Sequence, residues 1–125
     1  SSLTDRIAHG AELSPKLVAE EAEMGDPFSL EIILETARYL AIGIVNLMHT
    51  IDPNGILVGG AMTFGGNDSE LGRRFLDETR AEVGRRAYAV CSQNTVIDFA
   101  TLGGDAGFIG AAGITRAEYL KRRTL

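Results

Sequence analysis

Residues 56–62, Ile-Leu-Val-Gly-Gly-Ala-Met, decide how this chain folds. The first three form a short run without a polar face, which is typical of a parallel strand covered on both sides. The strand ends at Gly59 and Gly60, and a glycine pair there lets the backbone approach a ligand that any side chain would hold away. The stretch therefore predicts a parallel sheet with a binding site where a strand ends.

A second strand, predicted at residues 95–100, leads into another glycine-rich segment at residues 103–112. This segment predicts a loop followed by a helix with an unusually small face. Asp105 is expected to cap that helix, which runs to about residue 121, rather than to serve as a catalytic carboxylate.

Three further helices are predicted over residues 15–24, 27–50 and 70–87. The first two begin with Ser-Pro and Asp-Pro pairs, which supply a capping side chain and a proline suited to the first helical turn. The third follows two candidate caps, Asp68 and Ser69. The order helix, helix, strand, helix, strand, helix predicts two parallel strands joined by a crossover.

The predicted fold class is α/β with two parallel strands and four helices, incomplete as a domain because two strands are too few for a stable open sheet. Residues 37–48 are apolar almost all round, so this helix is expected to be buried on more than one side, with Gly43 against another backbone. Residues 1–13 carry no strong period and are expected to form a connector. Residues 1–125 are therefore expected to be a fragment that exposes apolar surface and associates with itself.

Charge and cysteine content exclude several classes of protein. The formal net charge of −5 argues against non-specific nucleic-acid binding, and the arginines of residues 73–86 alternate with acidic residues as on a solvated, ion-paired face. The single cysteine, Cys91, excludes an intrachain disulfide, and His9 and His49 lack the spacing of metal ligands. No signal peptide or membrane-spanning run is present, so we expect a cytoplasmic protein without a membrane partner.

Three motifs follow one another along the chain. They are a long helix ending in Ile51-Asp52-Pro53, a strand ending in Gly59-Gly60, and residues 102–112, Leu-Gly-Gly-Asp-Ala-Gly-Phe-Ile-Gly-Ala-Ala. In this order and spacing they resemble the C-terminal part of ROK-family sugar kinases, bacterial glucokinases especially. That family belongs to the actin/hexokinase/Hsp70-like ATPase superfamily, so the resemblance, which covers residues 12–120, implies a partial ribonuclease-H-like lobe.

The resemblance also implies a function for these motifs. Gly59 and Gly60 match the adenosine motif, whose backbone flanks the adenine and ribose of ATP, and Ala61 and Met62 would line the same pocket. The last helix matches an interdomain helix that packs closely against the other lobe. The intact parent would be an ATP-dependent hexose kinase, using ATP with Mg²⁺, and most similar to a glucokinase.

Several parts of the family pattern are absent from these residues. The phosphate loop of the type Asp-x-Gly-Gly-Thr, the catalytic aspartate and the cysteine cluster that binds zinc are all expected upstream, in the missing N-terminal lobe. We therefore expect no catalytic residue, no metal ligand and no kinase activity in this chain alone. Two alternatives stay open: the C-terminal domain of a sugar-responsive transcriptional repressor of the same family, and a self-associating module without nucleotide binding.

Overall fold

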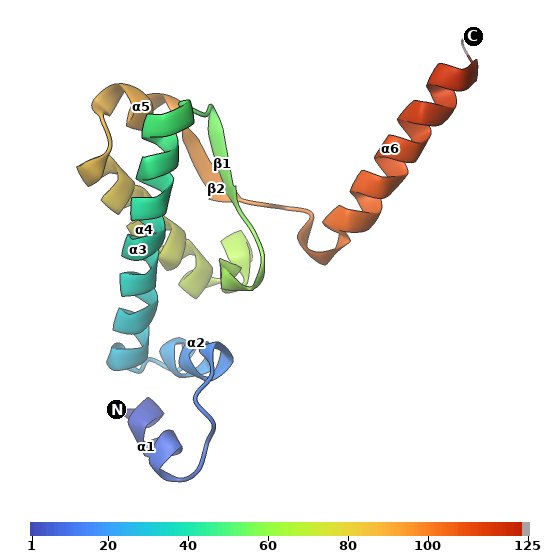
Figure 1. Ribbon diagram of the computed structural model, residues 1–125. Helices are drawn as coiled ribbons and strands as arrows, with labels where there is room; N and C mark the ends of the chain where they lie inside the picture. The colour runs from blue at the N-terminus through green and yellow to red at the C-terminus, as the bar shows by residue number, and fades with distance from the viewer. Residues whose placement is uncertain (124–125) are drawn as a thin grey trace.

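The computed structural model describes residues 1–123, so the last two residues of the expected 1–125 unit lie outside the described part of the chain. Within these residues, two parallel strands are accompanied by six α-helices and three short 3₁₀ turns (Figure 1). In chain order they are α1 (Ser2–Ala8), α2 (Pro15–Glu23), α3 (Pro27–Ile51), β1 (Gly55–Val58), η1 (Ala61–Thr63), η2 (Gly66–Asp68), α4 (Glu70–Arg86), α5 (Ala89–Asn94), β2 (Val96–Phe99), η3 (Gly103–Asp105) and α6 (Ala106–Arg123). The α/β fold class with two parallel strands is confirmed, whereas the expectation of four helices is wrong.

Side-chain caps begin three helices where the sequence places them. Ser14 caps α2, Asp26 caps α3, and Ser69 caps α4, which decides between the two candidates for that helix. In each case the side-chain oxygen accepts the backbone N–H three residues further on, which satisfies an amide that has no partner inside the helix.

The core lies between α3 and α4, which pack along one another. On α3 the contact side carries the small residues Ala37 and Ala41, which are completely buried. Small side chains let a neighbouring helix come close, and α4 fills the space with Phe75, Leu76 and Val83. The α3–α4 pair is the platform on which the sheet rests.

The sheet places only one of its faces on this platform. Val58 of β1 and Ile97 and Phe99 of β2 are buried there. The opposite face is open, since Leu57 and Val96 are 70% and 63% exposed. The expectation that β1 is covered on both sides is therefore wrong within the described residues, because no helix of this part of the chain lies over its second face.

The N-terminal residues form a helix rather than the expected connector. Ser1 caps α1, and the Ser2 N–H donates to the Asp26 carboxylate at 3.0 Å. The buried carboxylate of Glu21 accepts from the Ser2 hydroxyl and pairs with Arg6 at 2.7 Å. These bonds fix α1 against α2, and local periodicity does not show them because the partners are up to 24 residues apart.

Two other local expectations are corrected. A further helix, α5, follows α4 directly, and its Cys91 is partly buried against the core, as a small apolar residue would be. The expectation that the Asp105 side chain caps α6 is wrong. It belongs to the 3₁₀ turn that runs straight into α6, and no capping bond from its side chain is present.

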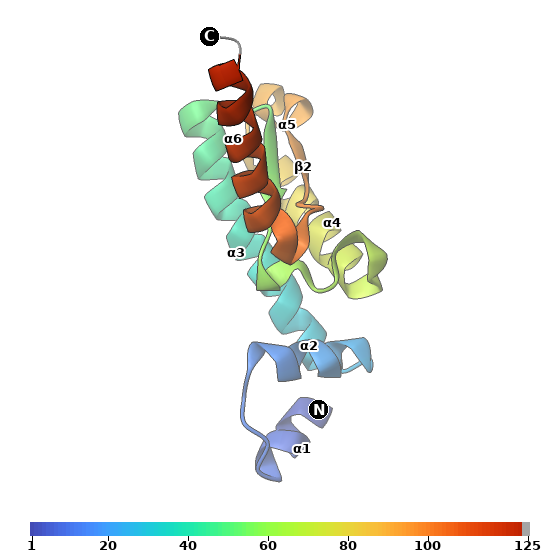
Figure 2. The same cartoon turned by 90° about the vertical axis from the view of Figure 1, so that its right-hand side faces the viewer.

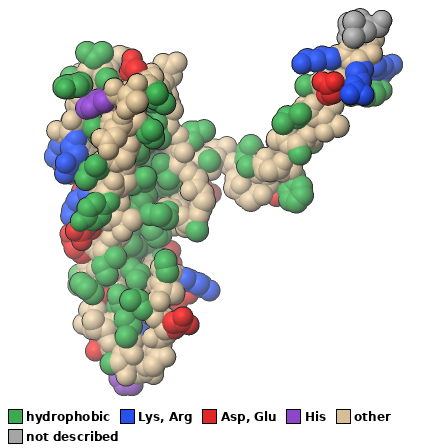
Figure 3. Space-filling model, viewed as in Figure 1, with side chains coloured by type: hydrophobic (Ala, Val, Ile, Leu, Met, Phe, Trp, Pro, Cys, Tyr) green, Lys and Arg blue, Asp and Glu red, His purple; other side chains and the backbone are tan. Residues whose placement is uncertain are grey.

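Much apolar surface stays open on α3 and α6. Within the described residues no atom lies close to the position that a Gly43 side chain would take, and Tyr39, Ile42 and Leu47 are exposed. The expectations that residues 37–48 are buried on more than one side and that Gly43 lies against another backbone are therefore wrong for this part of the chain. Helix α6 projects from the body (Figure 1), and in the view turned by 90° it passes in front of α3 and the strands (Figure 2). All of its residues are exposed. Figure 3 shows hydrophobic side chains spread along α6 and over the face of the body that Figure 1 presents to the viewer. No helix in residues 1–123 is long and apolar enough to cross a membrane.

Replacing Phe75 by alanine tests the α3–α4 platform. The ring is completely buried and lies 5.0 Å from the Phe64 ring, so its loss should reduce the free energy of unfolding by about 3–5 kcal/mol. Phe28→Ala is the matched control, because Phe28 is half exposed at the start of α3. Urea unfolding followed by circular dichroism measures both, and equal midpoints in the two variants would contradict the placement of the core.

Candidate functional site

The two strands end side by side at one edge of the sheet. Val58 of β1 is paired in register with Phe99 of β2, and the Ala100 N–H donates to the Val58 carbonyl at 2.9 Å just beyond them. A cleft of about 850 Å³ opens at this edge. Ligands of parallel α/β sheets bind outside the carboxyl ends of the strands, so the cleft lies where the fold favours a site. It is lined by Gly59, Gly60, Thr63, Gly65, Gly66, Asn67, Asp68, Phe99, Ala100, Thr101, Gly103, Gly104 and Ala106.

Six of the lining residues are glycines, so backbone forms much of the wall. Gly60 shows why this matters, because its φ of 84° and ψ of −161° fall in a region that only glycine adopts without strain. No atom of the described residues lies within 4 Å of the position of a Gly60 side chain. A ligand could therefore come into van der Waals contact with the backbone where any other residue would place a side chain.

The loop between β1 and α4 is held by a close contact with the first turn of α4. A Cβ atom on Gly72 would lie 2.2 Å from the Gly66 carbonyl oxygen and 2.8 Å from the Thr63 carbonyl oxygen. Both distances are far below van der Waals contact, so only glycine lets the loop rest on the helix. Because Thr63 and Gly66 line the cleft, Gly72 sets the position of one wall without facing the cleft itself.

The charge of the lining limits what the cleft can bind. No lysine or arginine is among the lining residues, and Asp68 is their one ionisable side chain. Phosphate groups are normally held by cations or by free backbone amides at a helix N-terminus. The described residues also contain no group of three or more metal-binding side chains. The lining therefore supplies no cation for a polyphosphate, and its backbone wall suits an uncharged polar group such as a nucleoside. The helix amides nearest to the cleft are those at the start of α6, whose first residue, Ala106, lines it.

The structure brings together two of the four predicted site residues. Gly59 and Gly60 line the cleft, whereas Ala61 and Met62 lie in the η1 turn outside the lining. Their role in binding stays a prediction. Sequence reasoning did not assign the loop of residues 63–68 or the segment 100–106 to the site. The pairs Gly65-Gly66 and Gly103-Gly104 are the signals that could have pointed to them.

Four of the five arginines of α4, Arg73, Arg80, Arg85 and Arg86, make hydrogen bonds or ion pairs within the fold, as the alternation of charges predicts. Arg80 donates to the Ile97 carbonyl from two nitrogens, at 2.9 and 2.7 Å, and so binds α4 to the edge of β2. Arg85 and Arg86 both pair with the nearly buried Glu82 carboxylate. These ion pairs leave no cluster of free cations on α4 that could hold a phosphate at the cleft.

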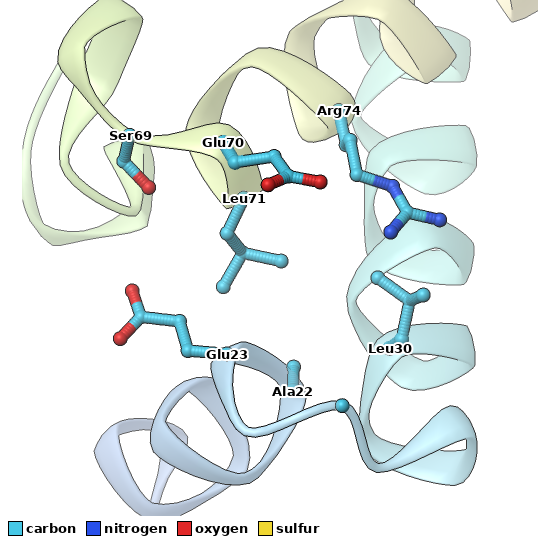
Figure 4. A pocket seen from close by; sticks show the side chains of 8 residues that line it. Ala22, Glu23, Leu30, Ser69, Glu70, Leu71 and Arg74 are labelled. Carbon is cyan, nitrogen blue, oxygen red and sulfur yellow. The ribbon is translucent and has the colours of Figure 1, made fainter.

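A second hollow, of about 320 Å³, lies between α2, α3 and the start of α4. In Figure 4, Leu71 and Leu30 point into it, while the Glu23 carboxylate points away from Arg74. Its charged residues, Glu23, Glu70 and Arg74, are exposed side chains of mixed sign. We assign the candidate site to the strand-end cleft, because that cleft is larger and combines a sheet edge with a glycine-built wall.

The chain is similar to proteins of one family over nearly its whole length. The model of the ROK family matches residues 2–118. A glucokinase from Halalkalibacterium halodurans is 29% identical over 114 residues, and a xylose repressor from Caldicellulosiruptor bescii is 24% identical over 109 residues. A crystal structure described as a putative sugar kinase from Cytophaga hutchinsonii superimposes with a TM-score of 0.70 at 26% identity.

These relatives are longer than the present chain. The similarity covers 91% of this chain but 32% of the glucokinase, and 87% of this chain but 26% of the repressor. For the crystal structure the covered shares are 92% of this chain and 40% of that one. The chain thus spans about a third or less of the length of these curated relatives.

Gly72→Ala tests the contact that holds the loop. The added methyl group would overlap two loop carbonyls, so we expect a loss of about 1–3 kcal/mol of stability and faster amide exchange in residues 63–68. Gly84→Ala is the matched control in the same helix, because no atom lies within 4 Å of its Cβ position. It should gain about 0.5–1 kcal/mol from helix propensity. Denaturant unfolding with hydrogen exchange measures both, and a neutral Gly72→Ala variant would disprove the contact.

Proposed function

The chain belongs to the ROK family, and on that premise we propose that it is the nucleotide-side part of an ATP-dependent hexose kinase, specifically a glucokinase. The reaction of the parent protein would convert ATP and glucose to ADP and glucose 6-phosphate. The observation that carries the proposal is the glycine-lined cleft at the ends of two parallel strands, in a chain similar to a glucokinase over most of its length.

The proposed role of the cleft is to bind the adenosine part of ATP. The backbone at Gly59 and Gly60 would lie against the base and ribose, because no side chain fills that wall. An uncharged nucleoside also agrees with a lining that has no lysine or arginine. Ala61 and Met62 remain proposed contacts, although they lie outside the residues that line the cleft.

The charged part of the nucleotide would be held elsewhere. Mg²⁺ would neutralise charge on the phosphates, and it is usually bound through phosphate oxygens and one or two carboxylates. Asp68 is the one lining carboxylate, so the phosphate loop, the catalytic base and further Mg²⁺ ligands are proposed to lie in an N-terminal lobe. Hexose would bind there too. The small face of α6, at Gly107, Gly110 and Ala111, would pack against a helix of that lobe.

A transcriptional repressor is the second candidate, because the chain is also 24% identical to a xylose repressor. In that case the same lobe would respond to a sugar, and DNA would be bound by a segment outside the present chain. Self-association through the exposed faces of α3 and α6, and a cytoplasmic location, are compatible with both candidates and stay predictions.

Hexose-dependent release of ADP by the full-length protein that carries this chain separates the two candidates. Glucose, N-acetylglucosamine and N-acetylmannosamine are tested in turn with Mg-ATP, and we expect turnover with glucose. Turnover with another of these sugars would support the proposal of kinase activity but change its proposed substrate. A folded protein without turnover on any of them would favour the repressor.

Gly60→Ala tests adenosine binding at the strand end. Its positive φ would cost about 1–3 kcal/mol in any other residue, and the methyl group would project into the cleft, so the Kd for ADP should rise. Gly25→Ala is the control, because Gly25 also has a positive φ, of 93°, but ends α2 away from the cleft. Isothermal titration with ADP distinguishes them, and equal Kd values in both variants would refute the assignment of Gly60.

A further inference from the structure

Asp98 joins the open face of β2 to the loop that lines the cleft. Its Oδ1 atom accepts from the side-chain amide of Asn67 at 3.2 Å and from the Phe99 N–H at 2.8 Å. The Arg80 guanidinium lies 3.7 Å from the same oxygen. One carboxylate thus connects β2, α4 and the loop, although Asp98 itself does not line the cleft.

Asn67 is also held from its other side. Arg73, in the first turn of α4, donates to the Asn67 carbonyl oxygen at 2.8 Å. The side chain of Asn67 is therefore tied to the sheet and its backbone to the helix. Arg80 adds a second link between the same two elements through its bonds to the Ile97 carbonyl. The loop cannot move away from the strand end without breaking one of these bonds.

The loop needs such bonds because its own sequence does not order it. It contains consecutive glycines, Gly65 and Gly66, and both have a positive φ, of 83° and 64°. Glycine loses more conformational freedom on ordering than any other residue. A wall that is ordered only when ligand binds lowers affinity, whereas a preorganised wall does not.

We propose that Asp98 is a positioning residue for nucleotide binding, which holds the glycine-rich loop of residues 63–68 in place through Asn67. The proposal rests on the proposed adenosine site, because it assigns to Asp98 the ordering of one wall of that site. Asp98 touches neither the reacting groups nor the cleft, so its effect is on affinity for nucleotide rather than on the chemical step.

The charge of Asp98 supports this role. The hydrogen bond from Asn67, the backbone N–H of Phe99 and the positive charge of Arg80 lower the pKa of the carboxyl, against partial burial, which raises it. The Asp98 carboxyl is ionised at neutral pH, as any aspartate of ordinary pKa is, and the lowered pKa means that its neighbours favour the ionised form. Hydrogen bonds to a charged acceptor are stronger than those to a neutral one. Its contribution is therefore present above the ordinary aspartate pKa and is lost only as the pH falls through the lower value.

Asp98→Ala in the full-length protein tests the proposal. We expect the KM for ATP and the Kd for ADP to rise by about threefold to tenfold, as for the loss of one intramolecular hydrogen bond of typical net strength. The kcat at saturating ATP should change by less than about twofold, because Asp98 does not act on the chemical step. Asp98→Asn should recover part of the affinity, since its amide oxygen can still accept from Asn67.

Asp77→Ala is the matched control. Asp77 also pairs with Arg80, at 3.6 Å, but no hydrogen bond or ion pair joins it to residues 63–68 of the loop. Its variant should keep the nucleotide affinity of the wild type. Hydrogen exchange in residues 63–68, measured without nucleotide, should be faster in Asp98→Ala than in Asp77→Ala.

The two readouts separate this proposal from the proposed function. If the wild type binds nucleotide but Asp98→Ala matches it in affinity, the positioning role is overturned. If the wild type binds no nucleotide, the adenosine site itself fails, and the exchange measurement then decides whether Asp98 orders the loop. Equal exchange in Asp98→Ala and Asp77→Ala would overturn the role in either case.

Discussion

The contact between Gly72 and the loop above it is the constraint on which the candidate site depends. Two loop carbonyls lie closer to this position than any side chain would permit. The first turn of α4 therefore fixes the wall of the cleft, and Ser69 begins the helix at that place by capping it. Three residues further along, Phe75 anchors the same helix against α3. The geometry of the site thus depends on the packing of α3 against α4 as well as on the strands.

The sequence predicts the parts of the fold whose signals are local. A helix cap or a short apolar strand can be recognised from a few neighbouring residues. The caps at Ser14, Asp26 and Ser69 and the apolar run of β1 all lie where the sequence predicts them. The N-terminal helix α1 was missed because it is fixed by tertiary bonds to Glu21 and Asp26. For the same reason the Asn67–Asp98 bond, which joins residues 31 apart, has no signature in either segment taken by itself. Glycine pairs locate the site, but only the fold shows which loop residues surround it.

The exposed apolar surfaces follow one pattern. The open face of the sheet, the exposed side of α3 and the whole of α6 carry apolar residues, although their composition is that of buried elements. Soluble proteins rarely leave contiguous apolar surface of this kind without a partner. The chain spans about a third or less of the length of its curated relatives. In the proposed parent protein, these faces would be the ones that further elements cover. Fold class could therefore be predicted from the sequence, whereas the extent of burial could not, since apolar composition does not show which face of a strand or helix has a neighbour.

The composition of the cleft suggests that the nucleoside and the phosphates of a nucleotide would be bound by different groups. A wall made of backbone adds little specificity for charge, but it lets a flat uncharged group come close over a wide area. Tight binding of phosphates requires cations or free amides, and Arg80, Arg85 and Arg86 of α4 are already paired with the Asp98 and Glu82 carboxylates and the Ile97 carbonyl. Using those arginines to hold the platform together leaves them unavailable to the ligand. Under the proposed function, a triphosphate would have its nucleoside held by this chain and its charge neutralised by the proposed N-terminal lobe, and the chemical step would take place at the junction between the two.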